Sequence, residues 1–113
     1  MFKSNHIFKE ESYYQPLTED RFGKLPWEVM QATDLSIGSK AVYALINMYA
    51  TNDLRECWHG NRKFAHNINL SMRQVARYLQ ELDDRGYIRR EMRWHEDKEF
   101  EITKEIRYIT ILK

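Results

Sequence analysis

The sequence predicts a single α+β domain that is mainly α: a three-helix core, an extra N-terminal helix and a C-terminal two-stranded β-hairpin. The first observation is length, because 113 residues suffice for one compact domain and not comfortably for two. The second is that residues 61–85 read as two short helices joined by a tight turn. The third is Gly86, which stops the second helix directly before an aromatic, β-branched, arginine-rich strand.

Residues 1–20 show no clean helical or strand period, and Pro16 argues against a continuous helix. We interpret this segment as an N-terminal arm that is extended or partly ordered by docking, and residues 21–113 as the domain. Phe8, Tyr13 and Tyr14 give the arm aromatic side chains that could pack on another surface. The arm is therefore a candidate contact in a homodimer.

Two helices are predicted at the start of the domain. Pro26 fits the first turn of a helix that runs to about Thr33. Ser36 is a good N-cap for a second helix of about residues 36–51. The buried stripe predicted for that helix consists of Ala41, Val42, Leu45, Ile46, Met48 and Tyr49. Residues 54–60 then predict a small strand that closes onto the hairpin.

The next two predicted helices are joined by a turn at Asn69-Leu70. Asn61 is predicted to cap a helix of about residues 62–68, and Ser71 to cap one of about residues 72–85. The first of these helices is predicted to bury Phe64, Ala65 and Ile68. The second is predicted to bury Val75, Ala76, Leu79 and Leu82.

Two antiparallel strands, Tyr87–Trp94 and about Glu105–Leu112, complete the prediction, with residues 95–104 as the tip between them. Helix, turn, longer helix, glycine and hairpin is the order of a winged helix-turn-helix domain. Such a domain presents its second helix to the major groove. The sequence therefore predicts sequence-specific binding of double-stranded DNA.

Charge is unevenly distributed, although the net charge is only +1. Residues 55–93 carry nine Lys/Arg and five Asp/Glu, a balance of +4, and eight of the nine are arginine. Arginine forms forked hydrogen bonds with phosphate and with guanine edges, which lysine does less well. The small total predicts moderate affinity for one domain, so we expect two copies on repeated or palindromic half-sites.

The predicted DNA contacts fall into three groups. On the helix of residues 72–85, the residues left over from the core are suited to bases and flanking phosphates: Met72, Arg73, Gln74, Arg77 and Tyr78. At the starts of the two helices, the residues suited to gripping the backbone are Asn61, Arg62, Lys63 and Ser71. On the hairpin the candidates are Arg89, Arg90, Arg93 and Lys98.

Plain solvation is the alternative interpretation of these arginines, since exposed helix faces are commonly charged. For the hairpin the two interpretations are evenly balanced. Its tip is acidic, with Glu96, Asp97, Glu99 and Glu101. An acidic tip is repelled by phosphate, so it is expected to pack on a partner or to stay clear of the duplex.

Catalytic and metal-binding functions find no support in the sequence. Cys57, His59 and His66 match no structural zinc spacing, and no phosphate loop or nucleophile elbow is present. We therefore expect no enzyme activity, no cofactor and no small-molecule substrate. Cys57 is predicted to be a small buried residue beside Trp58. The three tryptophans are predicted to pack in the core or an interface rather than to stack on bases.

The predicted location is the cytoplasm. A single cysteine fits a reducing compartment. No apolar run approaches the roughly 20 residues that cross a bilayer. The first fourteen residues carry acids where a signal peptide needs an apolar region.

Three motifs resemble a known family. The first is an aromatic-x-Lys-Leu-Pro opening: Phe22, Lys24, Leu25 and Pro26. The second is a Leu-Ser start followed by a Lys-Ala helix: Leu35, Ser36, Lys40, Ala41 and Leu45. The third is a block over residues 71–88: Ser71, Arg73, Val75, Arg77, Leu79, Glu81, Leu82, Gly86, Tyr87 and Ile88. Together they resemble the winged helix-turn-helix domains of bacteriophage and plasmid replication initiation proteins, over about residues 22–112.

The resemblance implies DNA binding in replication initiation, with replisome proteins as further partners. The block over residues 71–88 is also shared with many winged-helix transcription regulators, so a transcriptional regulator is the nearest alternative. A third possibility belongs to another class: a winged helix that mediates protein interactions in a replisome or primosome assembly without binding DNA.

Overall fold

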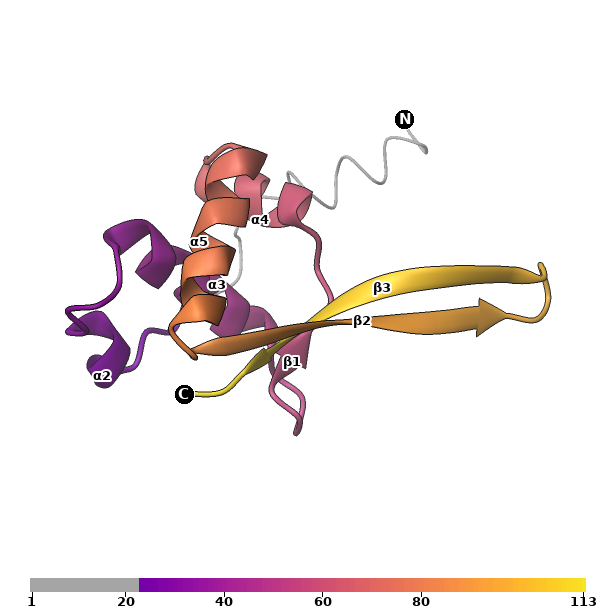
Figure 1. Cartoon of the computed structure of the whole chain (residues 1–113), viewed down its shortest axis with the longest axis horizontal. Coiled ribbons are helices and arrows are strands. Elements are labelled where there is room, and N and C mark those ends of the chain that lie inside the picture. The colour runs from indigo at the N-terminus through magenta and orange to yellow at the C-terminus, as the bar shows by residue number, and fades with distance from the viewer. Residues whose placement is uncertain (1–22) are drawn as a thin grey trace, which may run out of the picture.

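The computed structural model describes residues 23–113 as four helices and a three-stranded antiparallel sheet (Figure 1). The elements in chain order are α2 (Trp27–Met30), α3 (Ile37–Tyr49), β1 (Glu56–Cys57), α4 (Asn61–Ile68), α5 (Met72–Asp84), β2 (Ile88–Asp97) and β3 (Ile102–Ile111). The α+β class predicted from the sequence is confirmed, and the architecture is compatible with a helix-turn-helix domain. The predicted arm, residues 1–20, lies outside the described residues.

Local sequence signals fix the ends of α3 and α5. The Ser36 hydroxyl oxygen accepts a hydrogen bond from the Ser39 N–H at 3.2 Å, which confirms it as the cap of α3. Gly86 has φ +78°, in the left-handed region that glycine adopts without strain, and it ends α5 as predicted. The Tyr87 N–H then donates to the Leu82 carbonyl at 2.9 Å, which turns the chain toward β2.

Two predicted helix starts or ends are wrong. The helix after Pro26 ends at Met30, short of Thr33. Asn61 is the first residue of α4 and does not cap it, because Gly60 occupies the cap position. The Asn61 side chain is instead bound to β3, where its Oδ1 accepts a hydrogen bond from Arg107 Nη1 at 2.6 Å.

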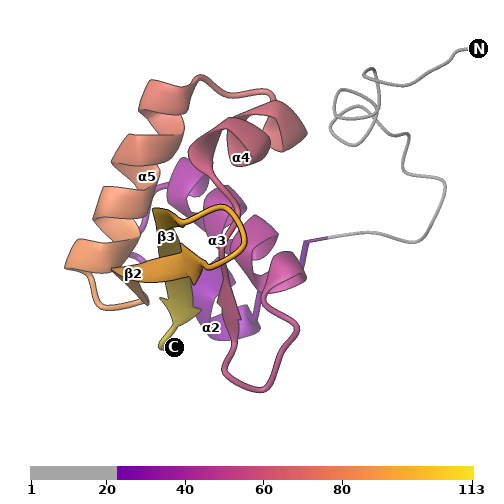
Figure 2. The same ribbon diagram turned by 90° about the vertical axis from the view of Figure 1, so that its right-hand side faces the viewer.

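The core lies where α3, α4 and α5 meet the base of the sheet. Ile46, Phe64, Leu79 and Ile109, one from each of these elements, have no exposed surface. Tyr43 is also fully buried, and its hydroxyl donates to the Lys113 carbonyl. The helices gather around one end of the hairpin, and the rest of the hairpin projects away from them (Figures 1 and 2).

Two alanines and three tryptophans are more exposed than the sequence predicted. Ala41 and Ala76 are exposed, whereas we predicted them in the core. Each neighbours a fully buried valine, and one residue of helix turns the side chain by about 100° away from that stripe. Core packing is also wrong for the tryptophans, because Trp27, Trp58 and Trp94 are 66%, 55% and 68% exposed.

The sheet order is β1-β3-β2, so β3 lies between the other two strands. The predicted small strand is confirmed, since Cys57 of β1 lies opposite Ile109 of β3. The hairpin is longer than predicted: β2 and β3 pair without interruption from Ile88↔Ile111 to Asp97↔Ile102. Most of the segment predicted as a tip is therefore strand.

The hairpin turn is formed by local hydrogen bonds. Asp97 Oδ1 accepts from the Glu99 N–H at 3.1 Å and the Phe100 N–H at 3.4 Å, as aspartate commonly does in turns. Glu101 takes a left-handed φ of 52° before β3 begins. The turn therefore needs only residues 98–101, which is why strand pairing continues so far from the core.

Candidate nucleic-acid interface

The α4–α5 junction is a tight turn held by backbone hydrogen bonds. Asn69 has φ 56° and ψ 45°, a left-handed conformation that asparagine tolerates better than most residues. The Leu70 N–H donates to the Ala65 carbonyl at 3.0 Å. Residues 69–71 therefore link the two helices in a tight turn, and the start of α5 is fixed relative to α4.

A capping box holds the first turn of α5. The Ser71 hydroxyl oxygen accepts from the Gln74 N–H, and Gln74 Oε1 accepts from the Ser71 N–H, both at 3.0 Å. Reading adenine by the usual two-bond contact would need the same Oε1 as an acceptor. As the structure stands, Gln74 caps α5, and its Nε2 group is the part available to a ligand.

The outward face of α5 is cationic at its start. Val75, Leu79 and Leu82 line the buried face, while Arg73 and Arg77 are exposed one turn apart on the other side. Neither arginine forms an ion pair within residues 23–113, and the first turn of α5 contains no acidic residue. Arg77 lies with its guanidinium carbon 5.3 Å from the centre of the Tyr78 ring. The structure thus leaves two uncompensated guanidinium groups at this end of the helix.

The first turn of α4 adds two more cations. Arg62 is exposed and Lys63 half-buried, and this turn also lacks an acidic residue. Lys63 Nζ lies 5.1 Å from the centre of the Tyr49 ring, an arrangement that orients the ammonium group. Asn61 points elsewhere because Arg107 binds its side chain. Figure 1 places α4 beside the N-terminal end of α5.

Tyr78 is committed to the contact between α5 and α3. A Cβ atom added to Gly38 of α3 would come within 2.1 Å of the Tyr78 ring. The absence of a side chain at Gly38 therefore makes room for the ring. Tyr78 is half-buried as a result, and its ring packs within the protein rather than projecting from α5.

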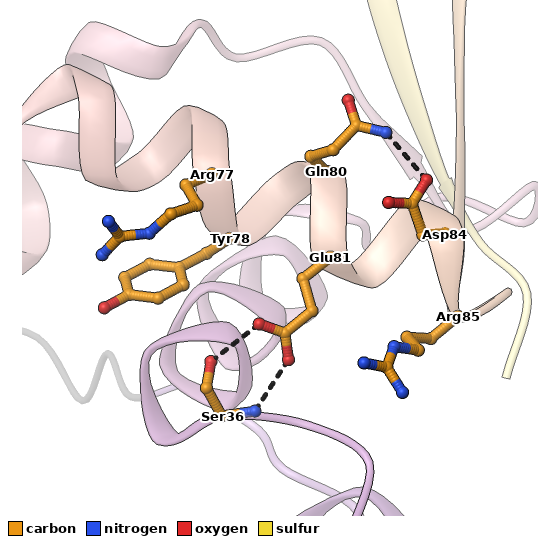
Figure 3. A pocket seen from close by; sticks show the side chains of 7 residues that line it. All are labelled: Ser36, Arg77, Tyr78, Gln80, Glu81, Asp84 and Arg85. Carbon is orange, nitrogen blue, oxygen red and sulfur yellow. Dashed lines mark hydrogen bonds between the residues drawn. The ribbon is translucent and has the colours of Figure 1, made fainter.

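Glu81 completes this contact, and the sequence did not point to it. Its carboxylate accepts from the Ser36 N–H at 2.8 Å and from the Ser36 hydroxyl at 3.0 Å (Figure 3). These bonds, the backbone one foremost, lower the pKa of Glu81. The two partners line a shallow cleft together with Arg77, Tyr78, Gln80, Asp84 and Arg85. An acid of α5 thus sits at the N-terminus of α3, where the helix dipole favours negative charge.

Two of the predicted hairpin cations are bound within the protein. Arg90 Nε lies 2.8 Å from Asp83 Oδ2 at the end of α5. Arg93 makes two bonds to Glu56, at 3.1 and 2.8 Å, and a third to Glu91 at 2.9 Å. These carboxylates, that of Glu56 foremost, raise the pKa of Arg93 further. Both arginines therefore tie the hairpin to the body of the domain.

The other two hairpin cations face solvent. Arg89 is 58% exposed, and the one carboxylate it reaches within the described part of the chain is that of Glu91, at 3.8 Å. Lys98 is exposed in the turn among the four acids of the tip. Because the hairpin leaves the body at the C-terminal end of α5, its tip projects away from the cationic first turn of that helix (Figure 1). The predicted site is thus split between helix starts that are open and a hairpin that is partly neutralised.

The buried cysteine and its neighbours form no metal site. Within residues 23–113, no group of three His, Cys, Asp or Glu side chains could hold a metal ion. Cys57 is fully buried as predicted, and burial raises its pKa to about 11. His59 stacks between Tyr49 and Trp58, with ring centres 4.0 and 5.5 Å away, and burial lowers its pKa to about 4. Cys57 and His59 therefore contribute to packing inside the domain.

Residues 33–88 match the family model of a helix-turn-helix domain. The matched span contains α3, β1, α4 and α5 and ends at the first residue of β2. No curated protein and no solved structure matches the chain. None of the described helices is long and apolar enough to cross a membrane. This match supports a helix-turn-helix domain in residues 33–88, and a domain of this kind suggests that the protein binds DNA.

Proposed function

We propose that this domain is a winged helix-turn-helix that binds double-stranded DNA in a sequence-specific manner. In this arrangement α5 lies in the major groove and the β2–β3 hairpin is the wing. The observation that carries the proposal is the start of α5, which follows the tight turn from α4. There Arg73 and Arg77 are exposed and have no acidic partner among residues 23–113. Arginine in this position can bond guanine edges or phosphate oxygens with both arms of its guanidinium group.

The contacts divide by position along α4 and α5. Arg73, in the first turn of α5, reads a base, and Arg77 reads a base or binds the flanking phosphate. Arg62, Lys63 and Ser71 hold phosphates at the two helix starts, where backbone N–H groups also point outward. Gln74 acts mainly by fixing the start of α5 through its capping box. Met72, 54% exposed, is placed for an apolar contact with a thymine methyl group.

The wing contributes through its base rather than its tip. Arg89 is exposed near the body of the domain, whereas Glu96, Asp97, Glu99 and Glu101 make the tip acidic. Phosphate repels these acids, so a tip that projects away from α5 keeps them clear of the duplex. Arg90 and Arg93 position the wing through their ion pairs with Asp83 and Glu56.

Salt dependence tests DNA binding itself. With the full chain on a random duplex, about four to six phosphate contacts should give a slope of about −4 to −5 in a plot of log affinity against log salt concentration. The slope arises because each neutralised phosphate releases condensed counterions. Binding that is undetectable, or insensitive to salt, would contradict the proposal.

We place this binding in replication initiation on a bacteriophage or plasmid. The support is the resemblance of the opening at Phe22, Lys24, Leu25 and Pro26 to replication initiation proteins. A transcriptional regulator would use the same surface of α5, so the location of the sites distinguishes the two roles. Selection of bound fragments from the host and element genomes should return iterated repeats at an origin, with replisome proteins as further partners. Single operators at promoters would favour regulation instead.

A protein-interaction module without DNA binding is the second candidate. Its support is the projecting end of the hairpin, where Trp94 and Phe100 are 68% and 65% exposed among acidic residues. Exposed aromatic side chains with a charged rim are typical of protein contacts. The salt titration separates this candidate from the first, because an interaction module would show almost no affinity for random duplex.

A further inference from the structure

Within the part of the chain that the structure describes, the outer edge of β2 is open along the whole strand. β2 is the last strand in the order β1-β3-β2, and its ten residues pair with β3 on one side only. The strand contains no proline, glycine or bulge that would interrupt a second pairing. Among residues 23–113, no backbone hydrogen bond reaches this edge from another element. An open edge of this length is a template for another strand.

We propose that this edge pairs with β2 of a second copy of the chain, antiparallel across a two-fold axis. The proposal rests on the proposed function in one respect: the dimer would supply one domain to each of two DNA half-sites. The pairing itself needs no DNA. Charge order along the strand selects this occupant. β2 carries Arg89 and Arg90 directly after its first residue, Ile88, and ends with Glu96 and Asp97. Antiparallel pairing therefore places the positively charged start of β2 in one copy beside the negatively charged end of β2 in the other.

The two-fold axis restricts the register. An axis perpendicular to an antiparallel sheet pairs one residue with its own copy, since only then do facing side chains share a side of the sheet. With Arg93 on the axis, the exposed Arg89 faces the partner's Asp97 and supplies the main attraction. Arg90 lies opposite the partner's Glu96 but is already bound by Asp83 at 2.8 Å. Moving the axis to Trp94 instead sets Glu91 against the partner's Asp97, which is repulsive.

The apolar side chains fit the same register. Met92 and Trp94 are 50% and 68% exposed and lie on one face of β2, and each would face the other type across the axis. Arg93, which meets its own copy, is already neutralised by Glu56 and Glu91 at 2.8 and 2.9 Å. The pairing joins two three-stranded sheets into one of six strands. Two paired edges make a small interface, so we expect a dissociation constant of about a micromolar or weaker.

Charge reversal tests the pairing with the full chain in the absence of DNA. Arg89→Asp sets two carboxylates against each other at both ends of the interface. Sedimentation should show association weakened about ten-fold or more. Lys104→Glu is the matched control, because it changes the net charge equally on β3, away from the open edge. A wild-type chain that stays monomeric at about 100 μM, or equal effects of the two variants, would overturn the proposal.

Cysteine pairing tests the register. Met92→Cys and Trp94→Cys chains, mixed and oxidised, should give a disulfide-linked heterodimer, because facing residues of antiparallel strands lie within disulfide range. Each variant alone should link less, since its two cysteines are diagonal neighbours. The native Cys57 is fully buried and does not compete. A mixture that links no better than either variant alone would refute the register. A wild-type chain that self-associates but does not bind duplex DNA would instead count against the proposed function and leave the pairing in place.

Discussion

Arg73 and Arg90 carry the same guanidinium group in opposite surroundings. Arg73 is exposed at the start of α5 and has no ion pair among the described residues. Arg90 is bound by Asp83 at 2.8 Å and by Gln80 at 3.0 Å. A guanidinium already bonded to a carboxylate must give up that partner before it can bind phosphate. At the residue scale, the available cations are therefore fewer than the arginine count implies.

Glu81 gives a pH prediction at this scale. Hydrogen bonds from Ser36 hold the folded-state pKa of Glu81 below its unfolded value of about 4.3. The stabilisation is therefore fully present above that value and is lost as pH falls through the folded pKa. Glu81→Gln should remove this part of the pH dependence, measured as the free energy of unfolding in urea at neutral pH and at about pH 3.

Glu99→Gln is the control for that measurement. Glu99 is exposed in the hairpin turn, and no ion pair among residues 23–113 involves its carboxylate. This variant should therefore lose stability with falling pH in the same way as the wild type. If Glu81→Gln also follows the wild-type curve, the bond to Ser36 does not contribute to stability in solution.

At the scale of elements, two features set the position of α5. The capping box and the left-handed Asn69 fix its start beside α4. The Tyr78 ring and the Glu81 carboxylate hold α5 against the N-terminus of α3. Because these contacts lie on both sides of the exposed Arg77, they determine the direction in which the cationic face of α5 points.

Gly38→Ala tests the contact between α3 and α5. Alanine is a better helix former than glycine by about 1 kcal/mol, so the substitution alone favours folding. The new Cβ would, however, lie 2.1 Å from the Tyr78 ring and displace it. We expect a net loss of about 1–2 kcal/mol in the free energy of unfolding, measured by urea denaturation.

The same substitution in a chain without the Tyr78 ring should have the opposite effect on stability. In a Tyr78→Ala chain the ring is absent, and Gly38→Ala should then stabilise the protein by up to about 1 kcal/mol. The two substitutions would thus be strongly non-additive. Stabilisation by Gly38→Ala with the ring present would show that Tyr78 does not rest on α3.

At the scale of the whole molecule, the helices were predictable because their signals are local. Ser36, Ser71 and Gly86 mark helix ends within a few residues of sequence, and the stripes of α3 and α5 repeat at helical spacing. The hairpin was predicted too short, because its outer half is polar and carries no apolar alternation. Its strands are instead specified by the Asp97 turn and by pairing with each other.

The candidate site was predictable only in part. The exposed residues at the start of α5 follow from the period of Val75, Leu79 and Leu82. The partners that neutralise other arginines do not follow, since Glu56 and Arg93 are 37 residues apart. The Glu81–Ser36 bond spans 45 residues and depends on how α5 crosses α3. Such contacts arise from tertiary packing, which a local pattern does not encode.

Binding of two single-alanine variants to a selected cognate duplex and to a shuffled one tests whether the start of α5 reads bases. Arg73→Ala should cost about 1–3 kcal/mol on the cognate duplex and relax base preference, because a bond to a base edge is lost. Lys63→Ala should weaken binding to both duplexes alike, because a phosphate contact carries no sequence information. If both variants bind every duplex equally weakly, or both bind as the wild type does, α5 does not read DNA through its cationic first turn.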